Sequence, residues 1–464
     1  MDELLNARLS TIAAAVRERK VKSTELVKAF LDRIEKVNPA LNAVVCSTAD
    51  LAMKYAAKFD AELESGSLRG PLHGVPMTMK DSLDTAEAVT TWGTQGRKDY
   101  RPGGDATCVS RLRHSGAILM GKTNTPEFTL SFQTDNLVYG RTNNPFDPSR
   151  TPGGSSGGAA AIIAAGASPF DIGTDTGGSI RLPSHFCGIT GIKPTTGRVP
   201  CTGNALPSSG LIASLSQPGP LARYVDDLAL LLPIISGPDF IDPYAVEAPW
   251  HDPDDVVVND LRIGYHTDNG IKTPTPEIRA AVDTAAGLLR DEGIQVNEAR
   301  PSGIEMAGFI SSRVFSADGG EMLEALLEDS HTTTPSPRIQ NSLDRRGPAI
   351  TQREVAQIVA IWDNYRSSML SFFRDFDVLV CPVNAHTAIT HGTQEDISAY
   401  SYTMAYNLTG WPGAVIRGGT DGSGLPIGIQ IVSRPFREDH CLAVARWLEA
   451  RLGQFPGPAI SAAG

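Results

Sequence analysis

An amphipathic stripe near the N-terminus is the first clear pattern along the chain. In residues 23–38, apolar side chains recur at three- and four-residue spacing, at Leu26, Val27, Phe30, Leu31 and Ile34. This spacing predicts a helix with one buried face, capped by Ser23 and ended by Pro39. A similar stretch from Pro276 to Glu292 is expected to end at Gly293. The chain is therefore predicted to contain amphipathic helices.

Short β-rich runs lie between such helices. They read LRIGYH at 261–266, DVLVCP at 377–382 and IGIQIV at 427–432. Helices that alternate with short hydrophobic strands favour a layered α/β fold over a helical bundle or an all-β sandwich.

Two further segments interrupt this alternation. Residues 304–350 have helical patterning broken at HTTTPSPR and DRRGP, and this segment is expected to cover a site. Residues 241–260 are rich in Pro and Asp. They are interpreted as an ordered surface excursion, with a true linker as the alternative.

Two polar, glycine-rich stretches are the chain's most unusual feature. TPGGSSGG at 151–158 and GTDTGGSI at 173–180 flank the run AAAIIAAGA. The residues of 159–165 favour a buried helix that the amides of the first loop would open. The second loop offers consecutive backbone N–H groups around a serine, and its glycines permit close approach of a ligand. A simple turn is the alternative, and a phosphate cradle is disfavoured because the Lys-Ser/Thr pair of a P-loop is absent.

A Ser-His-Asp site is not favoured. GGSSG at 153–157 matches the letters of a nucleophile elbow, but the preceding NNPFDPSRTP is incompatible with the strand that an elbow needs. His73, His114, His185 and His386 lie in no motif that marks a base, and each is interpreted as structural.

Lys80 lies in a mostly apolar stretch, GVPMTMKD, which is expected to form a turn. Two interpretations are open. A surface lysine would lay its methylenes along the apolar neighbours and keep its amine in water. A buried lysine would have a lowered pKa and act as a base.

Composition and charge narrow the class of protein. Apolar residues make up 41% of the 464, charged residues make up 20%, and the net charge is -11. This balance is typical of a globular protein and disfavours a nucleic-acid-binding face. The six scattered cysteines predict mostly buried, reduced thiols, with neither a disulfide framework nor a zinc site. Neither a signal-peptide pattern nor a membrane-spanning run is evident, so a cytoplasmic location is expected.

The two loops, Lys80 and their flanking segments together resemble the amidase signature family. The matching pieces include GVPMTMKD, KTNTPEF, YGRTNNPFDPSRTPGGSSGG, GTDTGGSIRLPSHFCGITGIKPT, NLTGWPGAVI and GLPIGIQIV. The resemblance extends from the first helix to about Leu448. It implies one large α/β domain with a central mixed, twisted β-sheet covered by helices on both faces. Within 1–464 it implies a helical N-terminal segment over about 1–60, a catalytic core over about 61–240, a variable, partly helical cover over about 300–350, and C-terminal core strands and a helix over about 370–452.

The same resemblance implies a Ser-Ser-Lys triad. Ser179 matches the family's nucleophile, Lys80 its base, and Ser155 the bridging serine, which in the family follows a cis peptide bond. The predicted oxyanion hole consists of the backbone amides of Thr176, Gly177, Gly178 and Ser179.

Other residues are expected to support this site. Asp175 and Arg181 would hold the nucleophile loop by hydrogen bonds, with contact between Arg181 and a substrate carboxylate as the alternative. Ser156 would hydrogen-bond near the loop. Thr129 and Ser131 match positions that line the acyl pocket in the family. Trp411 and Pro412 are expected to pack, and neither a metal nor a cofactor is implied.

The implied activity is hydrolysis of the C–N bond of a small amide or carbamate by a monomer or homodimer, with no membrane or nucleic-acid partner. Cleavage of urethanes, anilides and aryl esters is a variant with the same acyl-transfer chemistry. The amidase subunit of a glutamine-dependent tRNA amidotransferase is the alternative, disfavoured because TPEFTLSFQTDN lacks that subunit's usual run. The family's membrane-anchored lipid amidases are also disfavoured. So is a catalytically dead binding protein, because the lysine and both serines are present.

Overall fold

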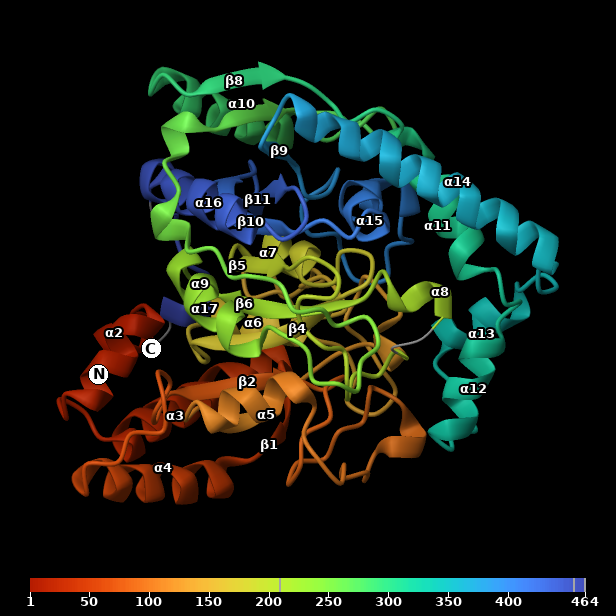
Figure 1. Ribbon diagram of the computed structural model, residues 1–464. Helices are drawn as coiled ribbons and strands as arrows, with labels where there is room; N and C mark the ends of the chain where they lie inside the picture. Colours follow the sequence, from red (N-terminus) through yellow and green to blue (C-terminus); the bar gives the residue numbers. More distant parts are fainter. Residues whose placement is uncertain (208–209, 454, 463–464) are drawn as a thin grey trace.

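An eight-stranded mixed sheet runs through the computed structural model, which describes residues 1–464 except 208–209, 454 and 463–464. The strand order is β4-β6-β5-β10-β11-β9-β7-β8. Neighbouring strands are antiparallel from β4 to β9, whereas β9, β7 and β8 are parallel (Figure 1). The strands are β4 (Phe170–Asp175), β5 (Thr190–Lys193), β6 (Gln217–Ala222), β7 (Arg262–Tyr265), β8 (Gln295–Glu298), β9 (Val378–Pro382), β10 (Gly413–Thr420) and β11 (Pro426–Ser433).

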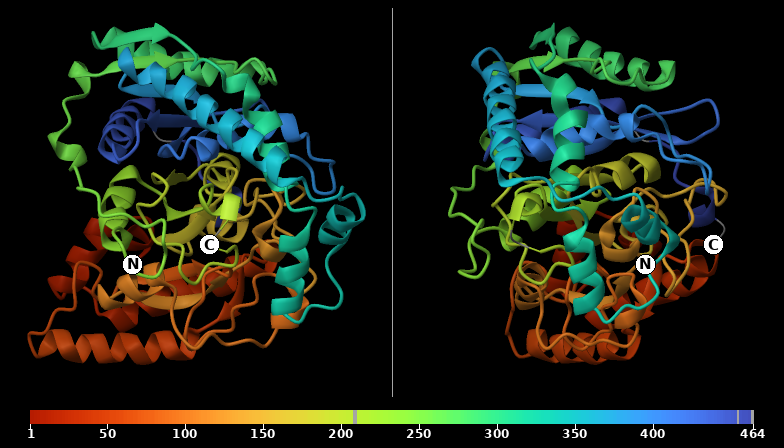
Figure 2. Two further views of the ribbon diagram at one scale, coloured as in Figure 1. Left: turned by 45° about the vertical axis from the view of Figure 1, so that its right-hand side comes forward. Right: turned by 90° about the vertical axis from the view of Figure 1, so that its right-hand side faces the viewer.

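Two groups of helices flank this sheet. Helices α9 (Val225–Ile235), α10 (Pro276–Asp291) and α16 (Glu438–Leu452) pack together in one group. The second group is formed by α6 (Gly157–Ala164) and α7 (Arg181–Cys187), which contact each other and the strands. Figure 2 shows the resulting layers from two further sides. The predicted α/β architecture, a mixed sheet flanked by helices in a single domain, is confirmed.

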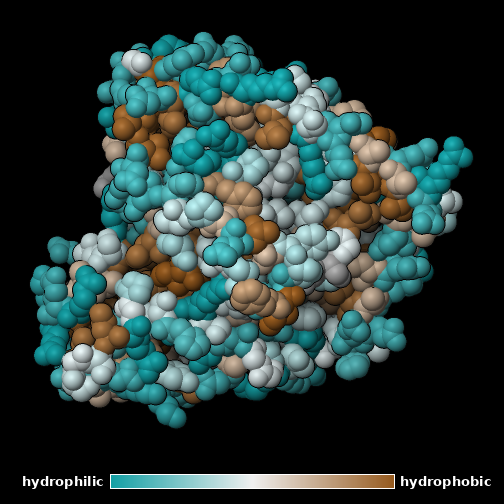
Figure 3. Space-filling model, in the orientation of Figure 1, coloured by the Kyte–Doolittle hydropathy of each residue, from teal (hydrophilic) through white to brown (hydrophobic). Residues whose placement is uncertain are grey.

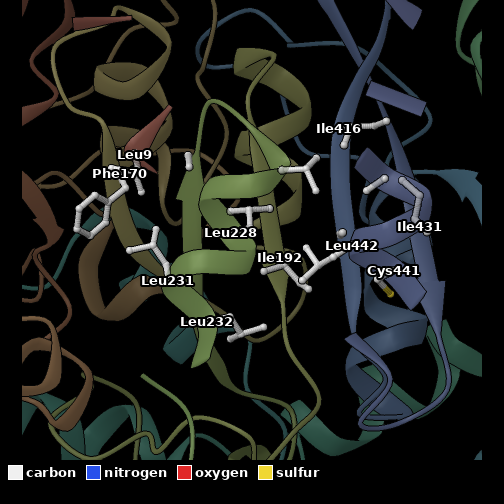
Figure 4. Close-up of a cluster of buried hydrophobic side chains, with 14 of the residues drawn as sticks. Leu9, Phe170, Ile192, Leu228, Leu231, Leu232, Ile416, Ile431, Cys441 and Leu442 are labelled. Atoms are coloured by element: carbon white, nitrogen blue, oxygen red, sulfur yellow. The ribbon is translucent and has the colours of Figure 1, made fainter. Parts of the chain in front are cut away.

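The largest core fills the space between the sheet and the first group of helices. Figure 4 shows Leu228, Leu231 and Leu232 of α9 beside Ile192 of β5 and Leu442 of α16. All five side chains are fully buried. Apolar burial on this scale holds the strands whose ends carry the polar loops.

A second, three-stranded sheet, which the sequence patterns did not predict, consists of β1 (Val44–Ser47), β3 (Ile118–Thr123) and β2 (Pro76–Lys80). It lies below the large sheet in Figure 1, with β2 beside β4. The buried Asp171 carboxylate of β4 joins the two sheets. It accepts hydrogen bonds from Lys80 N at 2.9 Å, Thr78 Oγ1 at 2.7 Å and Thr123 Oγ1 at 3.0 Å. Asp171 therefore aligns the end of β2 with β4.

The first predicted helix forms and begins at the predicted residue, but the predicted cap, Ser23, and the predicted stop, Pro39, are wrong. Helix α3 spans Ser23–Leu41, so Ser23 is its first helical residue and Pro39 lies inside its last turn. Asp60 takes the capping role from a neighbouring helix, since its carboxylate accepts from Ser23 N at 2.6 Å. Pro39 removes only one donor, and the turn closes through Asn42 N, which donates to Asn38 O at 2.7 Å.

The segment predicted as an interrupted helical cover contains α11 (Ala307–Phe315), α12 (Glu321–Asp329) and α13 (Pro337–Asp344), followed by α14 (Gln352–Leu370). Two of the breaks fall at the two predicted sequences, and a third, between α11 and α12, was not predicted. Helix α11 packs on α15 (Ser401–Leu408). Helices α12 and α13 pack around Phe128, at the right-hand edge of Figure 1. The cover therefore contacts the segment that precedes the first glycine loop.

The remaining helices are α1 (Asp2–Leu5), α2 (Leu9–Arg17), α4 (Ala49–Glu64), α5 (Thr107–His114), α8 (Gly210–Ala213) and α17 (Ala459–Ala462). Residues 241–260 contain two short 3-10 turns, Pro253–Asp255 and Val258–Asp260, and Asp254 pairs with Arg446 of α16. Over the face in Figure 3, hydrophilic side chains surround small hydrophobic patches. None of the helices among the described residues combines the length and apolar character that a membrane crossing requires.

Candidate active site

Lys80 is the last residue of strand β2, not part of a turn as predicted, and its side chain is fully buried. Its Nζ lies 2.7 Å from Ser155 Oγ, 3.0 Å from Ser156 Oγ and 2.9 Å from Thr174 Oγ1. The Thr174 carbonyl oxygen lies 3.4 Å away. The amine thus meets only uncharged oxygens, and the interpretation of Lys80 as a surface residue is wrong.

Burial strongly perturbs this amine. Loss of hydration lowers the pKa of Lys80 to about 7, although the carboxylates of Asp175 and Asp171 oppose the shift. An ordinary lysine titrates about three units higher. A substantial fraction of the Lys80 amine is therefore neutral near neutral pH and carries a lone pair.

The first glycine loop presents Ser155 and Ser156 to the amine. The peptide bond between Gly154 and Ser155 is cis, as the resemblance implied. No strand runs through 141–156, and α6 begins at Gly157, so the predicted buried helix and the absence of a nucleophile elbow are both confirmed. At Gly158 a Cβ would lie 2.4 Å from Asn124 N, so only glycine lets the helix start this close to its neighbour.

The second glycine loop follows β4 and is held by Asp175. The Asp175 carboxylate accepts from Gly178 N at 2.8 Å and from Ile180 N at 3.1 Å. Arg181, also fully buried, donates to the same carboxylate through Nε at 3.0 Å and Nη2 at 2.9 Å. The predicted hydrogen bonds of this pair are present. The Arg181 guanidinium is therefore directed at the Asp175 carboxylate, as expected for a residue that holds the nucleophile loop.

The charge of Asp175 is fixed by its partners. Burial alone would raise its pKa, but the Arg181 charge and hydrogen bonds, with the amide of Asn407, outweigh burial and hold the pKa of Asp175 well below its usual range. Asn407 Nδ2 donates to Asp175 Oδ1 at 2.8 Å and to Leu215 O at 3.1 Å. The second glycine loop is thus held by hydrogen bonds to a carboxylate that stays ionised at neutral pH.

Ser179 lies in this loop with 7% of its surface exposed, while Ser155 is 1% exposed. Among the described residues, no hydrogen bond joins Ser155 Oγ to Ser179 Oγ. The two loops instead meet through Ser156 N, which donates to Ser179 O at 3.2 Å. Active-site hydrogen bonds are often long before substrate binds. The Lys80 amine therefore contacts Ser155 directly. It is linked to the backbone of Ser179 through Ser156, which bonds both.

The backbone amides around Ser179 are not equivalent. Gly178 N is already engaged by Asp175. Within the described residues, the amides of Thr176, Gly177 and Ser179 donate to no protein acceptor. The Gly177 carbonyl is held by Thr403 Oγ1, which donates to it at 2.7 Å. The three free amides lie close together in one short, anchored loop.

Thr129 and Ser131 lie on the segment that packs against the first glycine loop. Thr129 is buried and has a left-handed φ of 64°. Ser131 Oγ accepts from Gln133 N at 3.0 Å. A Cβ on Gly154 would lie 2.7 Å from the Ser131 carbonyl oxygen. The segment therefore lies immediately beside Ser155.

Sequence reasoning missed Thr174 and Asp171, which both contact Lys80. The signal was present in FDIGTD, a strand whose six residues are all buried although three of them are polar. Buried polar side chains need partners, so their presence marks a strand that serves a site. Asn407 and Thr403 were also missed, because they come from α15, more than 220 residues further along the chain.

The histidines remain apart from this site. His185 is buried between His386 O, at 2.9 Å from Nε2, and Gly428 N, at 2.6 Å from Nδ1. Burial lowers its pKa to about 4 despite these two hydrogen bonds. Within the described residues, no group of three or more His, Cys, Asp or Glu side chains is arranged to hold a metal ion.

The chain is similar to several known proteins over nearly its whole length. The chain is 35% identical over 459 residues to an indoleacetamide hydrolase of Bradyrhizobium diazoefficiens, covering 95% of this chain and 86% of the relative. It is 33% identical over 469 residues to a subunit of the glutamyl-tRNA(Gln) amidotransferase of Heliobacterium modesticaldum, covering 94% of each. A solved structure of 6-aminohexanoate cyclic dimer hydrolase with its substrate superposes with a TM-score of 0.89 at 28% identity, covering 98% of this chain and 99% of that one.

A family model described as Amidase matches residues 25–442. This match covers most of the chain, including Lys80 and both glycine loops. The chain therefore belongs to the amidase signature family and is an amide-hydrolysing enzyme.

Proposed function

We propose that this enzyme hydrolyses small linear amides, and carbamates by the same chemistry, through Lys80, Ser155 and Ser179 and a covalent acyl intermediate. One observation carries the proposal. A fully buried lysine with a pKa lowered to about 7 lies 2.7 Å from Ser155 Oγ. A general base is most effective when its pKa lies near the working pH.

The three hydroxyl contacts of the Lys80 amine indicate how its lone pair is oriented. A neutral amine has two N–H donors and one lone pair. Thr174 Oγ1 and Ser156 Oγ, at 2.9 and 3.0 Å, can accept the two donors. The lone pair then faces Ser155, whose O–H donates to it. Thr174 and Ser156 are thus proposed to orient the base toward the relay.

In the proposed reaction, Lys80 takes the Ser155 proton while Ser155 Oγ takes the proton of Ser179. Ser179 Oγ forms a bond to the substrate carbonyl carbon, and the carbonyl oxygen becomes an oxyanion. The proton returns through Ser155 to the substrate nitrogen as the C–N bond breaks, because an unprotonated amide nitrogen is a poor leaving group. Water then attacks the acyl-enzyme through the same relay and releases the acid.

The proposed oxyanion hole uses the amides of Thr176, Gly177 and Ser179. Gly178 can contribute only by sharing an N–H that already bonds Asp175. Loss of one such donor typically costs about 3 kcal/mol of transition-state stabilisation. Thr403 holds the Gly177 carbonyl and so fixes the peptide plane that carries the Gly178 N–H, between the proposed donors Gly177 N and Ser179 N.

The test is hydrolysis of a panel of amides, p-nitroanilides and carbamates by the purified chain. Ser179→Ala should lose activity and keep its circular dichroism spectrum and melting temperature. Ser398→Ala is the matched control and should retain activity, because this partly buried serine of the 3-10 helix Ile397–Tyr400 uses its hydroxyl only to donate to Asp396, and its carbonyl still accepts from Ser401 Oγ. Full activity in Ser179→Ala would refute the assigned nucleophile.

The second candidate is an amidotransferase subunit that releases ammonia from glutamine for a partner. The 33% identity to a protein of that kind favours it. The two candidates differ in their dependence on a partner. Amide turnover by the chain alone supports the stand-alone hydrolase, whereas glutaminase activity that appears only with added partner subunits supports the amidotransferase.

A further inference from the structure

We propose that Phe132, backed by Tyr400, is a specificity-determining residue that selects amides with an aromatic ring on the acyl side of the scissile bond. The proposal rests on the function proposed above and names its substrate class. It assigns to one side chain a selectivity that neither glycine loop can supply, because both loops present backbone and small hydroxyl groups.

Phe132 lies between the two loops. Its backbone packs on the first: a Cβ on Gly154, the residue before Ser155, would lie 2.8 Å from the Phe132 carbonyl carbon. Its ring reaches the second: the corresponding point on Gly177 lies 3.6 and 3.8 Å from Phe132 Cζ and Cε1. Phe132 therefore lies against both loops, with its backbone beside the bridging-serine loop and its ring beside the nucleophile loop.

The ring is held in one orientation. Phe132 stacks on Tyr400 with centroids 3.9 Å apart and an interplanar angle of 5°. Tyr400 is 4% exposed, whereas Phe132 is only partly buried. Met404 Cε lies 2.7 Å from the Cβ position of Gly177, beside the ring. Phe132, Tyr400 and Met404 are called the aromatic wall below, or the wall for short. The ring is thus covered by Tyr400 on one face and points its Cζ edge at the nucleophile loop, and its exposed part is the surface that we assign to an apolar or aromatic partner.

Arg338 fastens this wall from the cover segment. Its Nε donates to Leu130 O at 2.8 Å, two residues before Phe132. Its Nη2 pairs with Glu395 Oε2 at 2.8 Å, five residues before Tyr400. The Glu395 side chain is 5% exposed and the Arg338 side chain 44%, so the buried carboxylate is paired with a cation that reaches the surface. The wall therefore presents aromatic and thioether surface with its nearby charged pair already satisfied.

This chemistry suits a neutral, planar acyl group. Aromatic pairs gain stabilisation beyond burial of area when one ring meets the edge or offset face of another. A zwitterionic amide such as glutamine would have to bury its charges against an uncharged wall, which is costly without partners. Arylacetyl amides therefore fit the wall better than amino-acid amides do.

The experiment compares phenylacetamide with its saturated counterpart, cyclohexylacetamide, so that size stays similar and aromaticity changes. The wild-type enzyme should prefer phenylacetamide in kcat/KM. Phe132→Leu should lower the phenyl-to-cyclohexyl ratio by about 5- to 10-fold, the part of an aromatic pair that burial of area does not supply. Phe132→Tyr should keep the ratio. Phe146→Leu, which removes another partly buried ring packed on the same cluster, should also leave it unchanged.

Each other outcome overturns the inference. These are a ratio that Phe132→Leu leaves intact, a wild-type preference for cyclohexylacetamide or glutamine, and turnover of acetanilide with none of phenylacetamide. Phe132→Tyr guards against misfolding of the leucine variant. If the wild-type chain hydrolyses other amides in a Ser179-dependent way, only the substrate class fails. If no amide is hydrolysed, the proposed function itself fails.

Discussion

Replacing Thr174 by valine tests how the buried lysine is oriented. Valine has nearly the shape of threonine, so the change removes the hydroxyl 2.9 Å from Lys80 Nζ and leaves the packing of β4 in place. The Thr174 carbonyl oxygen, at 3.4 Å, remains. The variant thus deletes one of three hydroxyl partners of the amine and leaves Ser155 and Ser156 untouched.

The size of the effect follows from the protonation state. A hydrogen bond to a charged group contributes about 1.5–3 kcal/mol, and one between neutral groups about 0.5–1.5 kcal/mol. The charged form of Lys80 therefore loses about 1 kcal/mol more than the neutral form. At 1.36 kcal/mol per pH unit this lowers the lysine pKa by roughly 0.7. Because one N–H anchor is lost, the lone pair also loses its direction, and the plateau rate should fall about tenfold.

The assay is kcat/KM against pH from 5 to 9. In the wild-type enzyme it should rise with pH through about 7, the pKa of Lys80, and then level off. In Thr174→Val the midpoint should move to lower pH and the plateau should drop. Thr190→Val, which removes a buried hydroxyl bonded to Ala222 O at 2.9 Å, should keep the wild-type midpoint. An unchanged plateau, or a midpoint that moves upward in Thr174→Val, would refute the reasoning.

Two further predictions concern stability. Asp175→Asn leaves the buried Arg181 charge without a carboxylate to balance it, so the free energy of unfolding should fall by about 3–5 kcal/mol, measured by urea titration, and activity should fall with it. An equal loss in an exposed pair, tested by Lys28→Gln, would contradict this. Burial raises the pKa of Asp227 to about 7, so its protonated form stabilises the fold below about pH 4 and that contribution is lost as pH rises to 7. Asp227→Asn, which keeps an acceptor for Leu9 N, should therefore gain stability over the wild-type chain between pH 4 and 7, and a parallel dependence on pH would contradict this.

Much of the fold could be predicted because its signals are local. The strands at 261–266, 377–382 and 427–432 form within one residue or two of their predicted bounds, since each is a short apolar run between polar residues. The cap at the start of α3 was predicted wrongly, because the true acceptor comes from another helix and no local pattern indicates it. Ser23 has the right chemistry for a cap, but its hydroxyl bonds no amide among the described residues, and Asp60 on α4 instead accepts from Ser23 N and Thr24 N at the start of the helix.

The site divides in the same way. The positions of the lysine and the two serine loops follow from motifs, whereas their supports come from distant parts of the chain. Asn407 and Thr403 reach the nucleophile loop from α15, and nothing within NLTGWPG or its surroundings indicates this. Tertiary contacts of this kind need the strand order of the sheet, which a single sequence does not specify.

The supports also limit how far the nearby carboxylates raise the pKa of Lys80, which burial lowers to about 7. Two carboxylates lie near Lys80, and either could have formed an ion pair that raised its pKa. Asp175 is committed to Arg181, and Asp171 accepts from the backbone of Lys80 and from two threonines instead of from Nζ. Burial raises the pKa of Asp171 to about 7, so its own charge is reduced near neutral pH. Arg181 therefore acts on the base without touching it, because it neutralises the carboxylate that would otherwise keep Lys80 protonated.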